Sequence, residues 1–60
     1  MRVLLIEDDQ GVRCLLTEAL ERRGWRVTSC EEGATAIALA ERESFDVAIC
    51  LGSLQYMNIE

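Results

Sequence analysis

The sequence contains neither lysine nor histidine, so all six of its positively charged side chains are arginines. The lack of lysine excludes a Schiff-base or P-loop lysine, and the lack of histidine excludes zinc-histidine sites and phosphohistidine chemistry in the chain itself. The three cysteines, Cys14, Cys30 and Cys50, are widely spaced and form no CxxC pair. This spacing argues against a zinc site or a disulfide scaffold and favours reduced, mostly buried thiols.

A long hydrophobic run is also missing. Four apolar residues, 3–6, precede a cluster of acids at the amino terminus, which is too few for a signal peptide or a membrane span. Acidic residues outnumber basic ones by 11 to 6, and no basic stripe is present. We therefore expect a cytoplasmic protein with no membrane partner, and no nucleic-acid binding by this segment.

What remains is a short, half-apolar chain of 60 residues. Its composition is that of a globular domain, but a chain of this length buries only about 60% of the surface that its unfolded form exposes. The core is therefore marginal, and we expect self-association or docking on another segment.

The order of elements is predicted from the hydrophobic periodicity. Continuous apolar runs suit strands covered on both faces, and apolar residues at helical spacing suit helices packed on a sheet. We expect strands at about 2–7, 25–30 and 45–51, and helices at about 10–23 and 34–43. The inner faces of the helices are predicted to comprise Val12, Leu15, Leu16, Ala19 and Leu20, and then Ile37, Leu39 and Ala40.

Alternating strands and helices imply parallel pairing with right-handed crossovers, and a strand order of 2-1-3 places a switch point between strands 1 and 3. The first strand ends there in Glu7 and Asp8. Two adjacent acids at this edge suit a Mg²⁺ ion that keeps several of its waters, but acids also cap the following helix. For Glu7 and Asp8 the pattern leaves both readings open, whereas Asp9 is expected to serve only the helix.

The stretches "VLLIEDD" and "RRGWRVTSCEEGATAIALAERESFDVAI" closely resemble the first half of the receiver domain of bacterial two-component response regulators, of the chemotaxis-receiver type. The resemblance implies a β-α-β-α-β half of a flavodoxin-like doubly wound parallel sheet, whose full strand order is 2-1-3-4-5. It also implies that a histidine kinase transfers a phosphoryl group to an aspartate of the intact parent, with Mg²⁺ required. The counterparts of strands 4 and 5 are expected to be missing, so that this chain is a partial receiver over residues 1–60.

Few residues of the family's phosphorylation site have a matching residue in this chain. Glu7 and Asp8 match the metal-binding acidic pair, and we expect Mg²⁺ to bind there only weakly, as at a vestigial site. The phospho-accepting aspartate falls on Leu51, or on Cys50 if one residue has been lost, and neither can form an acyl phosphate. The family's lysine has no counterpart, because the chain contains none.

The expected function is therefore that of a truncated or degenerate receiver that is not an enzyme and acts as a homodimer. Pairing of the two third strands would complete the sheet, with the interface formed by Val47, Ile49, Leu51 and Leu54. The alternative is a phospho-accepting receiver fragment that is active with Mg²⁺ only when a second segment completes it.

Overall fold

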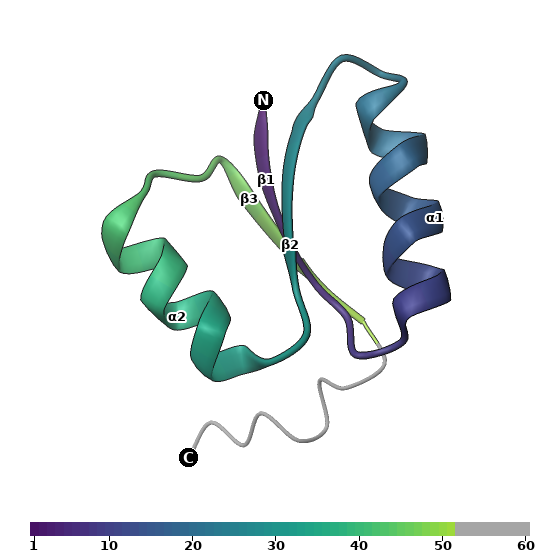
Figure 1. Ribbon diagram of the computed structural model, residues 1–60. Coiled ribbons are helices and arrows are strands. Elements are labelled where there is room, and N and C mark those ends of the chain that lie inside the picture. Colours follow the sequence, from purple (N-terminus) through teal and green to yellow (C-terminus); the bar gives the residue numbers. More distant parts are fainter. Residues whose placement is uncertain (52–60) are drawn as a thin grey trace.

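The structure, a computed structural model, describes residues 1–51. Strands and helices alternate along the chain in the order β1 (Arg2–Ile6), α1 (Gln10–Glu21), β2 (Arg26–Cys30), α2 (Gly33–Arg42) and β3 (Val47–Cys50). The three strands are parallel, with the spatial order β2-β1-β3, and the two helices cover opposite faces of the sheet (Figure 1). The predicted half of a doubly wound sheet, with strand order 2-1-3, is confirmed. Among the described helices, none has both the length and the apolar character needed to cross a membrane.

The bounds of the elements differ from the predicted ones by one or two residues. Helix α1 ends at Glu21 because the chain turns at Gly24, which has a positive φ of 87° that glycine adopts without strain. Strand β3 begins at Val47, because its pairing with β1 runs only from Val3 opposite Val47 to Ile6 opposite Cys50.

Strand β1 forms the centre of the core, and its residues 3–6 are all buried. Successive side chains of a strand point to opposite faces, so Leu4 and Ile6 share one face and Val3 and Leu5 share the other. Leu4 and Ile6 pack with Cys30 and with Ala36 of α2. The prediction that this apolar run is covered on both faces is confirmed.

The predicted inner faces of the helices are wrong at five positions. Val12, Leu15 and Ala19 of α1 are exposed, Leu15 by 67%, and Ile37 and Ala40 of α2 are exposed too, Ile37 by 58%. Helix α1 packs chiefly against β2 and β1, which leaves its Val12 and Leu15 side uncovered by the described residues. Helix α2 approaches the sheet through the small side chain of Ala36, which turns Ile37 away from the core.

Candidate functional site

The carboxyl ends of all three strands meet at Glu7. The Glu7 N–H donates to the carbonyl of Cys30 at 3.0 Å, and the Leu51 N–H donates to the carbonyl of Ile6 at 3.2 Å. Glu7 therefore lies between the ends of β2 and β3, as the strand order predicts. Leu51 lies directly beside the peptide that links Ile6 to the acids.

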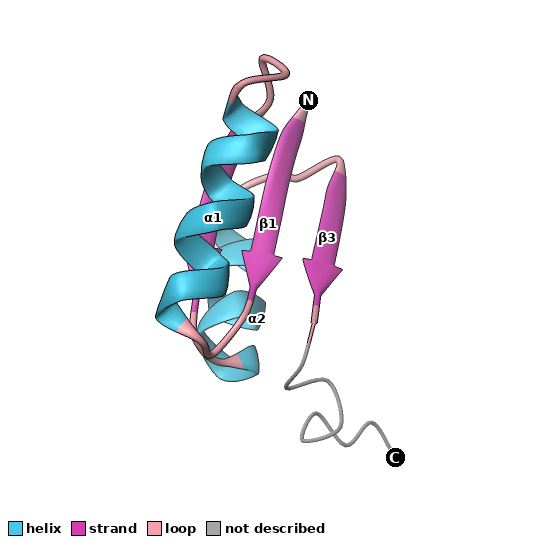
Figure 2. Ribbon diagram, turned by 90° about the vertical axis from the view of Figure 1, so that its right-hand side faces the viewer, coloured by secondary structure: helices cyan, strands magenta, loops and turns pink. Residues whose placement is uncertain are grey.

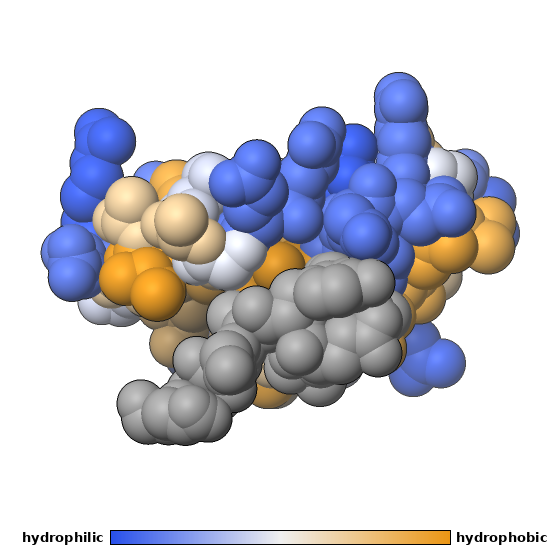
Figure 3. All heavy atoms as spheres, turned by 90° about the horizontal axis from the view of Figure 1, so that it is seen from below, coloured by the Kyte–Doolittle hydropathy of each residue, from blue (hydrophilic) through white to orange (hydrophobic). Residues whose placement is uncertain are grey.

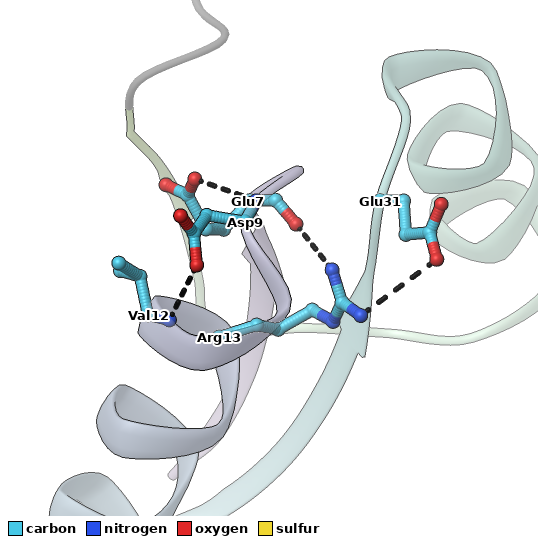
Figure 4. Close-up of polar contacts among 5 residues, drawn as sticks. All are labelled: Glu7, Asp9, Val12, Arg13 and Glu31. Carbon is cyan, nitrogen blue, oxygen red and sulfur yellow. Dashed lines mark hydrogen bonds and ion pairs between the residues drawn. The ribbon is translucent and has the colours of Figure 1, made fainter.

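The acids after β1 are held by the start of α1 (Figure 4). Asp9 is the N-cap residue, and its Oδ1 accepts a hydrogen bond from the Val12 N–H at 3.0 Å. The Glu7 side chain is buried, and its Oε2 accepts from the Asp9 N–H at 3.0 Å. Asp8 is exposed. The prediction that Asp9 serves the helix is confirmed, and Glu7 also uses one carboxylate oxygen to order this turn.

Arg13 is a residue of this corner that the sequence reasoning missed. Its Nη1 donates to the Glu7 carbonyl at 2.7 Å, and its Nη2 lies 3.7 Å from Glu31 Oε2 (Figure 4). The side chain is only 15% exposed although it is charged. Arg13 thus connects the loop after β1 to the loop after β2. The only signal in the sequence is that Arg13 lies one turn after the acids, near the start of the predicted helix.

Replacing Arg13 with methionine is expected to destabilise the fold by about 1–2 kcal/mol, because a charge-assisted hydrogen bond to a part-buried carbonyl is lost. The matched control is Arg22→Met, since the Arg22 side chain is 77% exposed and pairs with Glu18 only at the surface. That control should change the free energy of unfolding by less than about 0.5 kcal/mol. Urea denaturation followed by circular dichroism measures both, and equal losses would contradict this role for Arg13.

The donor set at this corner fits a weakly held Mg²⁺ ion. Residues 1–51 contain no group of three or more acidic, cysteine or histidine side chains that could hold a metal. Glu7 and Asp8 supply two carboxylates, and one Glu7 oxygen already accepts from the Asp9 N–H. Mg²⁺ is commonly bound by one or two carboxylates and several waters. The two acids as metal ligands thus remain a prediction.

Two cysteines flank this end of β1, because Ile6 lies opposite Cys30 on one side and opposite Cys50 on the other. Burial raises the pKa of the Cys30 thiol above its ordinary value of 9.0, and the hydrogen bond to the Glu32 carbonyl and the nearby Arg13 guanidinium only partly oppose the rise. Cys30 is therefore a protonated core residue at neutral pH, which makes it a poor nucleophile.

The predicted interface residues are placed as follows. Val47 and Ile49 lie on β3, Leu51 follows it, and Val47 and Leu51 are among the exposed large apolar residues. Leu54 lies outside the described residues. Whether these residues form an interface stays a prediction.

A parallel 2-1-3 sheet with an acidic pair at its carboxyl end defines the chain as half of a flavodoxin-like α/β domain. Residues 3–58 match the response regulator receiver domain, and the chain belongs to this family. The chain is therefore related to the receivers of two-component signalling, which generally bind Mg²⁺ at their phosphorylation site.

Three curated relatives agree with this assignment. The chain is 44% identical over 48 residues to the transcriptional activator protein PfeR of Pseudomonas aeruginosa, covering 80% of this chain and 16% of PfeR. It is 40% identical over 48 residues to the response regulator receiver protein CpdR of Brucella abortus, covering 80% and 40% of the two chains. It is 34% identical over 47 residues to the probable transcriptional regulatory protein TcrX of Mycobacterium tuberculosis, covering 78% and 20%. The chain thus spans less than half the length of these relatives, and no solved structure matches it.

Proposed function

We propose that this chain is a receiver module of two-component signalling that does not accept a phosphoryl group and acts by associating with a second copy of itself. The observation that carries the proposal is the hydrogen bond from the Leu51 N–H to the Ile6 carbonyl, at 3.2 Å. It holds position 51 beside the acids at the end of β1. The side chain at that position is a hydrocarbon, which has no oxygen to attack phosphorus.

Among residues 1–51, neither Cys50 nor Asp46 offers a replacement for the carboxylate that position 51 lacks. The Cys50 thiol lacks the second oxygen that a carboxylate can offer a metal. Asp46 lies at the opposite end of the sheet, where its N–H donates to the Arg2 carbonyl at 2.8 Å and its Oδ2 accepts from the Arg2 N–H at 2.7 Å. The distance from Arg2 to Glu7 along β1 is about 16 Å, at about 3.3 Å per residue. We therefore propose a binding module rather than a phosphotransfer enzyme.

Mg²⁺ has a limited part in this proposal. Glu7 and Asp8 would hold the ion, and the ion would neutralise their charge. The Arg13 guanidinium donates to the backbone carbonyl of Glu7, at 2.7 Å, and pairs with Glu31, so it leaves the two carboxylates to the ion. Binding in the millimolar range, rather than a tight site, is the expectation.

Self-association is supported by the outer edge of β3. Among residues 1–51, no strand pairs with β3 on the side away from β1 (Figure 2). Val47 at this edge is 39% exposed. An apolar edge strand pairs readily with another chain, and a core built on so few residues gains from the additional burial.

The remaining partners follow from the family and the charge. Receiver domains of intact response regulators work with histidine kinases, and we propose that this chain, in the cytoplasm, has lost the transfer step of that partnership. The formal net charge of −5 opposes binding to nucleic acid or to an anionic membrane surface.

The test is incubation of the chain with Mg²⁺ and acetyl phosphate, followed by intact mass spectrometry, with an active receiver domain treated alongside as the positive control. The expected result is an unchanged mass. Light scattering on the same sample should give the mass of a dimer at micromolar concentration, with or without acetyl phosphate. A base-labile phosphoryl adduct would overturn the proposal and favour the alternative, a phospho-accepting fragment that a second segment completes.

A further inference from the structure

We infer that the charge of Arg13 sets how tightly the acidic corner, formed by Glu7, Asp8 and Asp9, binds a divalent cation, and that it holds this affinity low. The inference rests on the proposed weak binding of Mg²⁺ by Glu7 and Asp8, and it names the residue that keeps the binding weak. Arg13 is not a ligand of the ion. It acts on the ion through its position and its charge.

The carboxyl end of the sheet is acidic. Three carboxylates follow β1 and two follow β2: Glu7, Asp8, Asp9, Glu31 and Glu32. Viewed from this end, hydrophilic side chains gather along the upper side of the molecule (Figure 3). Acids that gather at one end of a protein raise the local concentration of cations. The strength of cation binding therefore depends on the positive charge that lies among the acids.

One arginine of the described chain lies among these acids. The chain has six arginines, all within residues 1–51. Five of them lie toward the opposite end of the sheet, because they begin β1 and β2, follow α1 or end α2: Arg2, Arg26, Arg22, Arg23 and Arg42. Arg13, near the start of α1, is the sixth, and it contacts both acidic loops.

Two contacts fix the position of the Arg13 guanidinium. Its Nη1 donates to the backbone carbonyl of Glu7 at 2.7 Å, and its Nη2 lies 3.7 Å from Glu31 Oε2. Neither contact engages the Glu7 carboxylate, whose Oε2 accepts from the Asp9 N–H at 3.0 Å. The guanidinium therefore does not compete with an ion for the oxygens of the predicted metal pair, and its effect on the ion is one of charge.

Solvent screens this charge poorly. The Arg13 side chain is 15% exposed, whereas that of Arg22 is 77% exposed. A charge that is largely removed from water acts through a lower effective dielectric constant, and dissolved salt screens it less. A divalent cation held by Glu7 would enter the same corner as this guanidinium. The two like charges repel, which lowers the affinity for the ion.

Glu31 offsets part of the Arg13 charge. Its carboxylate lies 3.7 Å from the guanidinium, but the side chain is 67% exposed, so the pair is partly screened. Removing the Glu31 charge would leave Arg13 less opposed. The inference therefore predicts changes of opposite sign at the two residues, with tighter cation binding without the Arg13 charge and weaker binding without the Glu31 charge.

The test is a titration of the full chain with MgCl₂ at constant ionic strength, followed by the NMR chemical shifts of the Asp8 and Asp9 backbone N–H groups. Arg13→Met removes the charge and keeps a long side chain, and its Mg²⁺ dissociation constant should fall by about three- to tenfold. Glu31→Gln should raise the constant by about two- to threefold.

Two further variants serve as controls. Arg22→Met removes an equal charge at the far end of α1, whose 12 residues span about 18 Å, more than the Debye length of about 8 Å at physiological ionic strength. It should leave the Mg²⁺ dissociation constant unchanged. Arg13→Lys keeps the positive charge but loses the planar fork of donors, so it should bind Mg²⁺ as weakly as the natural chain. Equal tightening in Arg13→Lys and Arg13→Met would assign the effect to the lost hydrogen bond and overturn the inference.

Circular dichroism establishes that each variant is folded. Unchanged or weaker binding of Mg²⁺ by folded Arg13→Met, or tighter binding by Glu31→Gln, would overturn the inference. If Arg13→Met did not fold, Glu31→Gln would decide alone, because a raised constant supports the inference and an unchanged one contradicts it. If neither the natural chain nor Arg13→Met showed a shift over the millimolar range, the inference and the proposed metal binding would both fail. The lack of phosphoryl transfer and the self-association would stand apart from that result, because mass spectrometry and light scattering measure them separately.

Discussion

Replacing Leu5 with alanine is expected to unfold most of the chain at room temperature. Leu5 is completely buried in the central strand, between β2 and β3. Such a substitution costs about 2–5 kcal/mol, through lost transfer free energy and the cavity that remains. A domain of this size rarely has more than about 3–5 kcal/mol of total stability. Circular dichroism at 25 °C and thermal melting measure the loss of folded structure.

The matched control for this prediction is the same substitution at an exposed site. Leu15 of α1 is 67% exposed, so Leu15→Ala removes little buried surface. Its effect on the free energy of unfolding should lie within about 0.5 kcal/mol. If Leu5→Ala melted at the same temperature as Leu15→Ala, β1 would not be the centre of the core.

Ala48→Pro is expected to remove self-association while the strands remain. The Leu51 N–H donates to the Ile6 carbonyl, and Ala48 lies opposite Leu4, so the Ala48 N–H points away from β1, at a sheet edge where proline is tolerated. By two-fold symmetry the dimer loses two N–H donors, each worth about 0.5–1.5 kcal/mol, so its dissociation constant should rise by about fivefold to a hundredfold. A light-scattering series over protein concentration measures this change, and circular dichroism reports on the fold.

Ile49→Pro provides the contrast, because the Ile49 N–H is directed toward β1, on the same side as the Leu51 N–H that donates to Ile6. Proline there removes a hydrogen bond inside the sheet, so this variant should lose folded structure as well as association. If Ala48→Pro still formed dimers of unchanged affinity, the outer edge of β3 would not be the interface.

The acidic corner shows how far local chemistry can be predicted. Asp9 precedes a helix and has the side chain that most readily accepts from an N–H two or three residues on, so its role as the cap was predictable from its neighbours alone. Glu7 was different, because its neighbours in the sequence left metal binding and helix capping equally open. The hydrogen bond between Leu51 and Ile6, which brings Leu51 beside the end of β1, joins residues 45 positions apart in the chain.

Arg13 could not be identified from the sequence for a related reason. Arg22 and Arg23 directly follow the same helix, and nothing local distinguishes them from Arg13. The distinction is that α1 crosses the sheet so that Arg13 reaches both the Glu7 carbonyl and Glu31. Only the packing of the helix on the strands determines which arginine lies there.

The sequence by itself determined the order of the elements, the buried central strand and the start of α1, because each depends on residues within about one turn or one strand of each other. The tertiary structure alone decided which side of each helix is covered and which hydrogen bonds hold the residues around the acidic corner. Val12, Leu15 and Ile37 have the periodicity of core residues, yet they are exposed in the described part of the chain. Helical periodicity specifies an apolar side, but burial also requires a neighbouring element to cover it.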